Sequence, residues 1–281
     1  MKTYLVTGGT DGMGKQLALR LLKDGERVIV VGRNPKKGEL FLADTEQIGA
    51  KQRATFIQAD LSLVDENRRL INELASRFDV LDGVVFCAVN FTQRKEPLIT
   101  KEGFEAIFAL TYLSRFVLSY GLTGMLEKSA DPIILSFCAA GVPASINWED
   151  IQFKNHFVST KAMVNSSKLN ESLGVGYGLN NSSGKIKYVL FNPGIMVKTT
   201  NIMKNLKFLL RLVAKVFGKS PEKAIEPALL LLKNVPKDKL TAIFQNRTKP
   251  LSLSKKSFDE SNAKRLYSMT KELLGKSEVR L

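Results

Sequence analysis

Short apolar runs alternate along the chain with longer stretches in which apolar residues recur every three or four positions. The short runs are rich in Val, Ile, Leu and Phe, which is typical of parallel strands buried on both faces. The longer stretches have the spacing of amphipathic helices. The pattern predicts strands at 3–7, 27–31, 54–58, 83–86, 132–136 and 186–190, with a last strand near 241–244. It predicts helices at 12–24, 63–78, 101–126, 153–173, 201–217 and 221–234.

Strands that alternate with helices from the first residues favour an α/β fold, in which a doubly wound parallel sheet carries helices on both faces. A chain of 281 residues is long enough for one large core of this class. No repeat, low-complexity tract or long linker divides it. We therefore predict a single domain over residues 1–281, in which residues 198–281 form a basic substrate lid and a C-terminal cap.

A glycine-rich segment follows the first predicted strand and opens the first predicted helix. It reads Thr7-Gly8-Gly9-Thr10-Asp11-Gly12-Met13-Gly14, with the spacing T-G-x-x-x-G-x-G. Such glycines let the backbone turn tightly and approach a pyrophosphate, which the free N–H groups at the start of the helix then bind. Because the segment lies between a strand and a helix, a dinucleotide site is a better interpretation than a purely structural turn.

The residues after the second predicted strand indicate which dinucleotide binds. An acidic residue there would hold the ribose 2′-hydroxyl of NAD(H). This chain instead has Gly32-Arg33-Asn34, with Lys36 and Lys37 close by. A guanidinium binds a 2′-phosphate bidentately, whereas a carboxylate repels it. We therefore predict NADP(H) in preference to NAD(H), with a solvent-exposed arginine that binds no ligand as the plainer alternative.

An acidic residue follows the third predicted strand, in the sequence Ala59-Asp60-Leu61. The Asp60 carboxylate is placed to accept a hydrogen bond from the adenine amino group. The alternative is that Asp60 only caps its own loop.

The net charge of +15 is unevenly spread. Residues 198–281 contain 19 Lys and Arg against 7 Asp and Glu, a net charge of +12. A basic face favours anionic partners, although a lysine-rich solvated surface explains the charge as well. No nucleic-acid-binding motif accompanies the charge, so we expect no nucleic-acid partner.

Within this basic region, residues 201–219 have the pattern of a basic amphipathic helix. Its apolar positions are Leu206, Leu209, Leu210, Val213, Val216 and Phe217. Its cations are Lys204, Lys207, Arg211, Lys215 and Lys219. A lid over the substrate is the plain interpretation. A helix on a membrane surface near a lipophilic substrate, or a docking site for an acidic partner, are the alternatives.

Composition limits the setting of the protein. There are two cysteines, Cys87 and Cys138, and one histidine, so we expect neither a disulfide framework nor a bound metal. The first apolar run already belongs to a predicted strand, so we expect no secretory leader. No window approaches the roughly 20 apolar residues of a membrane helix. We expect a cytoplasmic protein, peripheral to a membrane if residues 201–219 bind one.

Taken together, these motifs resemble the short-chain dehydrogenase/reductase family over nearly the whole chain. Pro193-Gly194, with Thr199 beyond, resembles the family's turn that closes on the nicotinamide. Residues 220–224 and 265–275 resemble the retinol-dehydrogenase-like branch. The resemblance implies a Rossmann-type sheet, a nicotinamide cofactor, and carbonyl reduction or alcohol oxidation of a small molecule. It also implies that outer helices pair subunits into a homodimer.

The resemblance assigns a set of residues to the cofactor, most of them in the glycine segment or at the ends of predicted strands. They are Gly8, Thr10, Asp11, Gly12, Met13, Gly14, Arg33, Asn34, Asp60, Leu61, Ala88, Lys161, Pro193, Gly194, Ile195 and Thr199.

The catalytic positions of the family have changed in this chain. The resemblance places the family's tyrosine at Phe157, its serine at Cys138, its helical asparagine at Thr111 and its lysine at Lys161. On the predicted helix, Lys161 lies four residues after Phe157 and on the same face. Phe157 has no proton to donate to a developing alkoxide, and a thiol is a weak hydrogen-bond donor. The predicted active site is therefore atypical.

Another group would have to supply the proton. His156 and Tyr112 adjoin the catalytic positions but, on helices, would point about 100° away from them. Ser136 shares a strand face with Cys138, deeper in the sheet. A hydroxyl on the substrate, or an enone that accepts hydride at carbon, are further alternatives. The pair Cys87 and Cys138 is either reactive or simply two small buried side chains.

These observations support two hypotheses. The intact cofactor motif favours an NADP(H)-dependent oxidoreductase that acts on a carbonyl, alcohol or enone without the usual acid, by substrate-assisted or direct hydride transfer. The replacement of three catalytic groups favours a catalytically inactive member of the fold, which binds NADP(H) as a structural ligand or sensor, or serves as a partner subunit. The enzyme is the preferred hypothesis.

Overall fold

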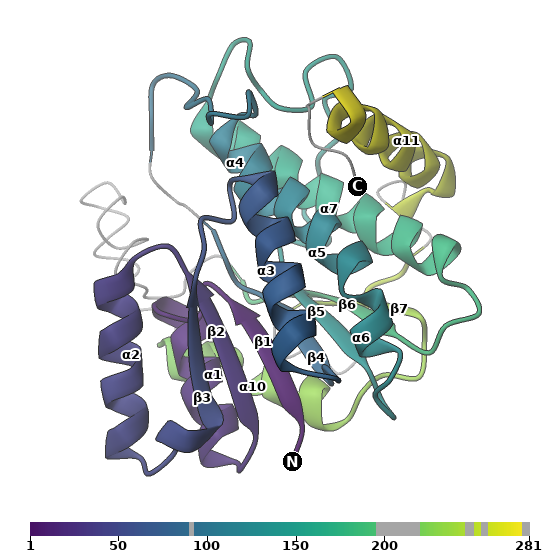
Figure 1. Cartoon of the computed structure of the whole chain (residues 1–281). Coiled ribbons are helices and arrows are strands. Elements are labelled where there is room, and N and C mark those ends of the chain that lie inside the picture. Colours follow the sequence, from purple (N-terminus) through teal and green to yellow (C-terminus); the bar gives the residue numbers. More distant parts are fainter. Residues whose placement is uncertain (90–92, 195–219, 245–249, 254–257, 277–281) are drawn as a thin grey trace.

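The computed structural model describes residues 1–89, 93–194, 220–244, 250–253 and 258–276 (Figure 1). Its centre is a seven-stranded parallel sheet in the order β3-β2-β1-β4-β5-β6-β7. The strand order reverses between β1 and β4, where a doubly wound sheet opens a crevice at the carboxyl ends of its strands. The strands are β1 (Thr3–Thr7), β2 (Arg27–Gly32), β3 (Ala54–Gln58), β4 (Gly83–Phe86), β5 (Ile133–Phe137), β6 (Lys187–Asn192) and β7 (Leu240–Phe244).

Each of the seven predicted strands is present, with bounds within two residues of those predicted. The runs of Val, Ile and Leu are buried because helices cover both faces of the sheet. The doubly wound parallel sheet predicted from the sequence is therefore confirmed.

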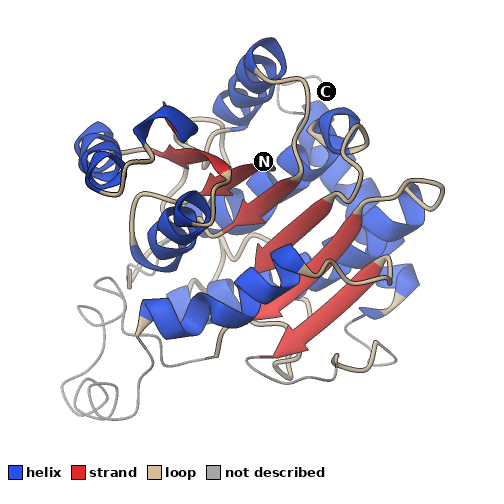
Figure 2. Ribbon diagram, turned by 90° about the horizontal axis from the view of Figure 1, so that it is seen from below, coloured by secondary structure: helices blue, strands red, loops and turns tan. Residues whose placement is uncertain are grey.

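Two layers of helices enclose the sheet (Figure 2). One face packs against α1 (Gly12–Lys23), α2 (Pro35–Gln47) and α10 (Pro221–Lys233). The other face packs against α3 (Val64–Arg77), α5 (Ser114–Gly121) and α7 (Ser159–Asn180). None of the helices in the described ranges is long and apolar enough to cross a membrane.

The last helix, α11 (Glu260–Lys276), packs on the outer side of α7. The Tyr267 ring lies 5.7 Å from the Phe116 ring and 5.4 Å from the Tyr120 ring, measured between centroids. The hydroxyl groups of Tyr112 and Thr270 form a buried hydrogen bond of 2.6 Å. α11 therefore covers the helical layer that contains α5 and α7, whereas α10 and β7 of the same C-terminal region belong to the opposite helical layer and to the sheet.

The predicted helix over 101–126 is wrong in its start and its continuity. Helical structure begins at α4 (Ala106–Phe108), continues through a π-helical turn at Ala109–Leu113 into α5, and ends in the short α6 (Thr123–Leu126). In the π-helical turn, the Thr111 hydroxyl donates to the carbonyl oxygen of Ile107 at 2.6 Å. A hydroxyl that competes for helix carbonyls in this way bends or widens a helix.

The predicted helix over 153–173 is displaced by about six residues at its start. α7 begins at Ser159, and the residues before it form a loop in which Phe153 and His156 have positive φ angles of 53° and 49°. A residue with a positive φ angle cannot be part of a right-handed α-helix. Phe157 therefore precedes α7, and the shared helix face predicted for Phe157 and Lys161 does not exist.

Two helices, α2 and α11, were not predicted from the apolar pattern. The apolar residues of α2 are adjacent, at Leu40, Phe41 and Leu42, rather than at helical spacing. The signals at its start are an Asn34 side chain that caps the helix and a proline at its first position. The helix predicted over 201–217 lies outside the described residues.

Candidate cofactor and active site

The glycine segment between β1 and α1 forms a tight cradle. Gly8 and Gly12 have positive φ angles of 67° and 55°. A Cβ atom on Gly8 would lie 2.7 Å from the Cα of Ala88, and one on Gly14 would lie 2.5 Å from the carbonyl oxygen of Gly8. Only glycine fits such approaches, so the segment is packed directly against the turn after β4.

The start of α1 faces this cradle. Asp11 caps the helix, and its side chain accepts a hydrogen bond of 2.7 Å from the backbone N–H of Gly12. Partial burial disfavours the Asp11 carboxylate, but hydrogen bonds from Lys37 and Gly12 outweigh that effect and lower its pKa. The other free N–H groups of the first turn and the helix dipole form a site for an anion such as a pyrophosphate.

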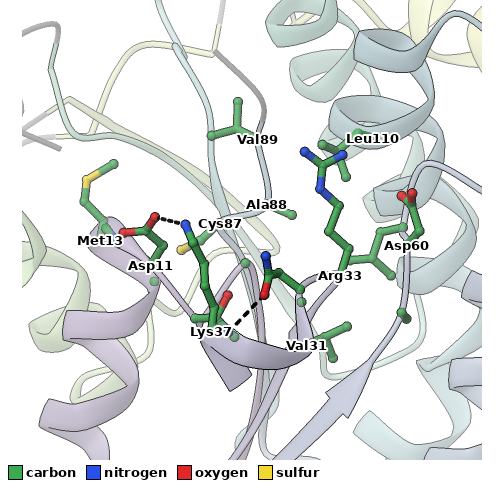
Figure 3. Close-up of a pocket in the computed structure, with 18 residues that line it drawn as sticks. Asp11, Met13, Val31, Arg33, Lys37, Asp60, Cys87, Ala88, Val89 and Leu110 are labelled. Atoms are coloured by element: carbon green, nitrogen blue, oxygen red, sulfur yellow. Dashed lines mark hydrogen bonds and ion pairs between the residues drawn. The ribbon is translucent and has the colours of Figure 1, made fainter. Parts of the chain in front are cut away.

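A single cleft contains the predicted cofactor residues from the glycine segment to Ala88 (Figure 3). They are Gly8, Thr10, Asp11, Gly12, Met13, Gly14, Arg33, Asn34, Asp60, Leu61 and Ala88. The residues that also line the cleft but were not assigned to the cofactor from the sequence are Val31, Gly32, Lys37, Ala59, Cys87, Val89 and Leu110. The glycine cradle and the helix start therefore fit a dinucleotide pyrophosphate.

One end of the cleft is basic. Arg33 follows β2 and is exposed, and no carboxylate pairs with it in the described part of the chain. Asn34 accepts a hydrogen bond of 3.1 Å from the backbone N–H of Lys37, whose amino group in turn pairs with Asp11. Lys37 is thus committed to the cap of α1, which leaves the Arg33 guanidinium to face a ligand.

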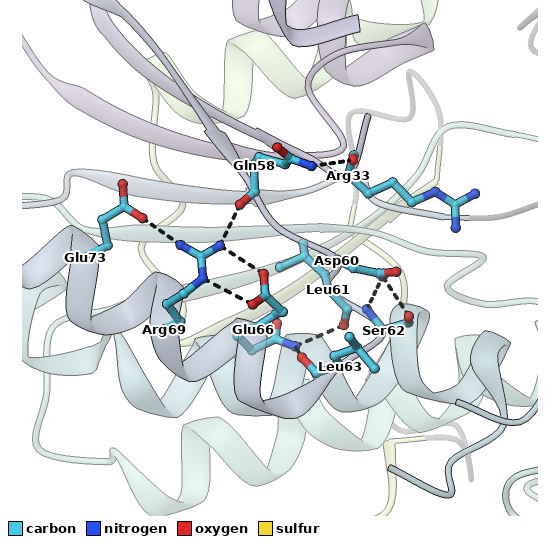
Figure 4. Close-up of polar contacts among 10 residues, drawn as sticks. Arg33, Gln58, Asp60, Leu61, Ser62, Leu63, Glu66, Arg69 and Glu73 are labelled. Carbon is cyan, nitrogen blue, oxygen red and sulfur yellow. Dashed lines mark hydrogen bonds and ion pairs between the residues drawn. The ribbon is translucent and has the colours of Figure 1, made fainter. Parts of the chain in front are cut away.

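Asp60 lies at the same end, in a loop with its own hydrogen bonds (Figure 4). One oxygen of Asp60 accepts from the backbone N–H and the hydroxyl of Ser62, at 3.0 and 2.7 Å. The Gln58 side chain donates to the carbonyl oxygen of Arg33 at 3.3 Å, and Arg69 donates to the carbonyl oxygen of Gln58 at 2.6 Å. These contacts hold the ends of β2 and β3 together beneath the Arg33 side chain.

The two cysteines lie on opposite faces of the sheet. Cys87 packs with the core beside α1, whereas Cys138 packs with the core beside α5 and α7. Burial raises the pKa of each thiol to about 12, although the Arg115 charge opposes this shift. Both thiols are therefore protonated at neutral pH, and their placement on opposite faces contradicts the alternative of a cysteine redox pair.

Ser136 and Cys138 share one strand face, as predicted. Ser136 is buried, and its hydroxyl accepts a hydrogen bond of 2.9 Å from the Arg115 guanidinium. The next turn is held by α7, because Ala139 N–H donates to the Ser167 hydroxyl at 2.7 Å and Gly141 N–H donates to Glu171 at 2.8 Å. The turn after β5 is thus attached to the middle of α7.

The same part of α7 reaches the π-helical turn that contains Thr111. Asn170 donates from its amide group to the carbonyl oxygen of Thr111 at 2.7 Å. One turn of helix, residues 167–171, therefore brings the predicted catalytic positions Thr111 and Cys138 to a common centre. Sequence reasoning missed this turn, because its polar residues lie on a helix without an amphipathic pattern.

Lys161 lies away from that centre. It is exposed and lines a shallow hollow with Phe153, Val164 and Asn165, outside the cofactor cleft. Lys168 is seven residues further along α7, about 10 Å along the axis and close to the same helix face. Its side chain is 3% exposed and pairs with Glu171 at 2.7 Å. The lysine at the common centre is therefore Lys168.

The turn after β6 is also tied to this region. Asn192 donates to the carbonyl oxygen of Ala140 at 2.9 Å and accepts from the Gly194 N–H at 2.9 Å. Gly194 has a positive φ angle of 92°. Pro193 and Gly194 therefore continue from β6 next to the turn after β5, while Ile195 and Thr199 lie outside the described residues.

A parallel sheet with a glycine cradle at its switch point defines a dinucleotide-binding fold. The chain belongs to the short chain dehydrogenase family, whose model matches residues 2–205. Members of this family bind NAD(H) or NADP(H), and the fold and family predicted from the sequence are confirmed.

Curated relatives support the predicted branch. Retinol dehydrogenase 13 of Mus musculus is 28% identical over 290 residues, covering 98% of this chain and 84% of its own length. Polyprenol dehydrogenase of Homo sapiens is 26% identical, covering 77% of this chain and 67% of its own length. An oxidoreductase of Emericella nidulans is 28% identical over 72% of this chain, and the match spans only 60% of that relative.

Solved structures show the same fold at low identity. A 7 alpha-hydroxysteroid dehydrogenase in complex with NADH and a 7-oxo bile acid superposes with a TM-score of 0.68 at 17% identity, covering 86% of this chain and 92% of its own. A short chain dehydrogenase of Escherichia coli in complex with NADPH superposes with a TM-score of 0.64 at 19% identity, covering 88% and 97%.

Proposed function

We propose that the chain is an NADP(H)-dependent oxidoreductase that acts on a carbonyl, alcohol or enone by a route without the usual tyrosine acid. The observation that carries the proposal is the complete cofactor cleft, in which a glycine cradle, a capped helix start and an exposed Arg33 lie together. When bound, the cofactor supplies or accepts the hydride. The residues of the chain orient the substrate and hold its oxygen.

Arg33 supports the preference for NADP(H). A guanidinium at the end of β2 binds a 2′-phosphate through charge-assisted hydrogen bonds, and no carboxylate from the described ranges competes for it. We expect Arg33→Asp to weaken NADPH binding by about 10- to 100-fold, because it replaces an attraction by a repulsion. NADH affinity should change little.

Titration of the nicotinamide fluorescence with NADPH and NADH measures this effect. Lys36→Asp is the matched control, since it makes the same charge change three residues away, at a side chain that does not line the cleft. Unchanged NADPH affinity in Arg33→Asp, or an equal loss in Lys36→Asp, would remove the support for NADP(H).

The lysine at the centre implies a different position for the missing tyrosine. In a Tyr-x-x-x-Lys pair that ends at Lys168, the tyrosine position is Val164, one helical turn before the lysine. We therefore assign the family's pair to Val164 and Lys168 in place of Phe157 and Lys161. Neither assignment places a tyrosine at the catalytic position, because residue 157 is Phe and residue 164 is Val.

The other proton donors considered from the sequence are hydrogen-bonded to other groups or lie outside the helix that contains Lys168. The Tyr112 hydroxyl bonds to Thr270 under α11, and Ser136 accepts from Arg115. His156 is exposed in the loop before α7. The Cys138 thiol stays protonated at neutral pH and orients a substrate oxygen only weakly. For carbonyl reduction the hydride goes to carbon, and we propose that a neighbouring hydroxyl of the substrate or water protonates the oxygen.

The names of the relatives favour a small lipophilic substrate, such as a retinoid or polyprenol, for this chain as well. We propose that the lid and C-terminal cap predicted over residues 198–281 of a single domain consist of the parts outside α10 and β7, which belong to a helical layer and to the sheet, with 201–219 as the segment that contacts a membrane surface. We also propose that the protein forms a homodimer and that it lies in the cytoplasm, peripheral to a membrane surface. Sedimentation with anionic vesicles, compared between the wild type and a Lys204/Lys207/Arg211 triple alanine variant, tests the membrane contact.

A catalytically inactive, cofactor-binding protein is the second candidate. The observation that favours it is the burial of Lys168 in an ion pair with Glu171, which occupies the lysine that a catalytic site would need. Turnover of NADPH with retinal or other aldehydes supports the enzyme. Tight NADPH binding without turnover of any aldehyde, ketone or enone supports the second candidate.

A further inference from the structure

Arg115 is a buried cation to which the proposed function gives no role. It lies on α5 and is only 3% exposed. Its guanidinium donates to the Ser136 hydroxyl and to the carbonyl oxygen of Phe137, each at 2.9 Å, and to the carbonyl oxygen of Ala88 at 3.4 Å. It thus joins the carboxyl ends of β4 and β5 at the crevice.

The charge of Arg115 is not balanced by an acidic residue. Glu171, the buried acid nearest the turn after β5, is already paired with Lys168 at 2.7 Å. Glu105, the other buried acid of this layer, caps α4 through the N–H groups of Ile107 and Phe108. No carboxylate of the described ranges forms an ion pair with Arg115. All its acceptors are neutral oxygens, so one positive charge remains at this place.

The position of Arg115 along the cleft follows from the sheet order. Arg33 and Asp60, at the ends of β2 and β3, form the adenosine end of the cleft. A dinucleotide that starts there crosses the glycine cradle and places its second half over β4 and β5. Ala88 lines the cleft, and its carbonyl oxygen accepts a hydrogen bond from Arg115. The unbalanced charge therefore lies at the end of the crevice that the nicotinamide would occupy.

We propose that Arg115 selects the redox state of the cofactor, so that the site binds NADPH more tightly than NADP⁺. This inference rests on the proposed binding of NADP(H) in the cleft. The two forms have the same phosphates and the same adenosine half, and they differ in the ring, which is neutral in NADPH and positively charged in NADP⁺. A buried cation repels only the oxidised ring.

The size of the effect follows from Coulomb's law. Two unit charges about 10 Å apart, in surroundings with an effective dielectric constant of about 20, repel strongly enough to change an equilibrium constant by about tenfold. The site would then bind the reduced cofactor more tightly and release the oxidised form more readily. By linkage, the same repulsion makes bound NADPH a weaker hydride donor, so the preference concerns the loading and release of the cofactor and not the chemical step.

The experiment compares three ligands on the full chain. They are NADPH, NADP⁺ and adenosine 2′,5′-bisphosphate, a fragment without the nicotinamide. In the wild type we expect NADPH to bind about tenfold more tightly than NADP⁺. In Arg115→Met the NADP⁺ affinity should rise relative to NADPH until the ratio falls to about one, while the affinity for the fragment stays the same. Arg115→Lys keeps the charge and should keep the ratio.

Arg53→Met is the matched control. Arg53 also donates to two backbone carbonyl oxygens, those of Leu22 and Glu26 at 2.7 and 3.1 Å, but away from the cleft. It should leave the ratio at the wild-type value. If Arg115→Met does not fold, Arg115→Gln removes the charge while it keeps an N–H donor for Ser136 and Phe137, and the same ratio is measured.

The outcomes separate the two proposals. Equal binding of NADPH and NADP⁺ by the wild type overturns the role of Arg115, as does a preference that persists without the charge. An equal loss for all three ligands in Arg115→Met also overturns it, because that pattern shows a purely structural residue. If the wild type binds none of the three ligands, the proposed NADP(H) site itself fails.

Discussion

The cofactor half and the catalytic half of the crevice differ in what they contain. Around β1, β2 and β3, the glycine cradle, the capped helix start and Arg33 form a complete ligand site. Around β4, β5 and α7, the described residues instead include buried charged groups: the Lys168–Glu171 ion pair and the Arg115 guanidinium, which donates to neutral oxygens. Under the proposed function, binding of the cofactor and protonation of the substrate are separable demands on this fold.

The largest expected effect concerns the ion pair in the catalytic half. Lys168→Met leaves the buried Glu171 carboxylate without its cation, so we expect the free energy of unfolding to fall by about 3–5 kcal/mol. Urea unfolding followed by circular dichroism measures it. Lys161→Met, on the exposed start of the same helix, should change the free energy by less than about 0.5 kcal/mol. Equal effects of the two variants would contradict the assignment of Lys168 to the centre.

The cofactor half is tested at Gly8. A methyl group there is strained by the positive φ and collides with the Ala88 backbone, so Gly8→Ala should weaken NADPH binding by about 100-fold, or ~2.7 kcal/mol. Gly25→Ala is the control, because Gly25 has a φ of 94° with no atom within 4 Å of a new Cβ. It should lose stability through strain alone and bind NADPH normally in a fluorescence titration. Normal binding by Gly8→Ala would show that the cradle holds no cofactor.

A tyrosine introduced into the catalytic half tests whether that half still positions a substrate. We expect Val164→Tyr to raise the rate of aldehyde reduction by about 10²-fold, the lower end of what a positioned general acid contributes. Phe157→Tyr, which lies before α7, should change the rate little. Initial rates of NADPH oxidation with retinal compare the two variants. A gain for Phe157→Tyr alone would return the tyrosine position to residue 157.

The smallest effect concerns the Cys138 thiol. Because its pKa is raised to about 12, alkylation by iodoacetamide should be slow at pH 7 and should rise about tenfold per pH unit toward pH 12. Mass spectrometry of the labelled peptide follows the reaction. Fast labelling that levels off near pH 8 would mean that the thiol is activated and that the site holds a nucleophile.

The strands were predictable because each is a short run of β-branched and other apolar residues that burial on both faces requires. The cofactor cleft was predictable because glycine spacing is a backbone requirement visible in sequence. The start of α7 was not, since residues 153–158 have helical spacing and the positive φ angles of Phe153 and His156 arise from loop contacts. Arg115 and Lys168 were missed for a related reason: a basic residue on a helix is usually solvated, and its burial depends on tertiary packing.

The separation of α11 from α5 in the sequence has a consequence for synthesis. Tyr112, Phe116 and Tyr120 are covered by Tyr267 and Thr270, and Thr270 follows Tyr112 by 158 residues, so the covering residues leave the ribosome much later. During translation the cofactor half has all of β1 to β3 available to fold early. The aromatic layer, in contrast, stays uncovered until α11 is made, so a nascent chain is open to proteases and chaperones on that side.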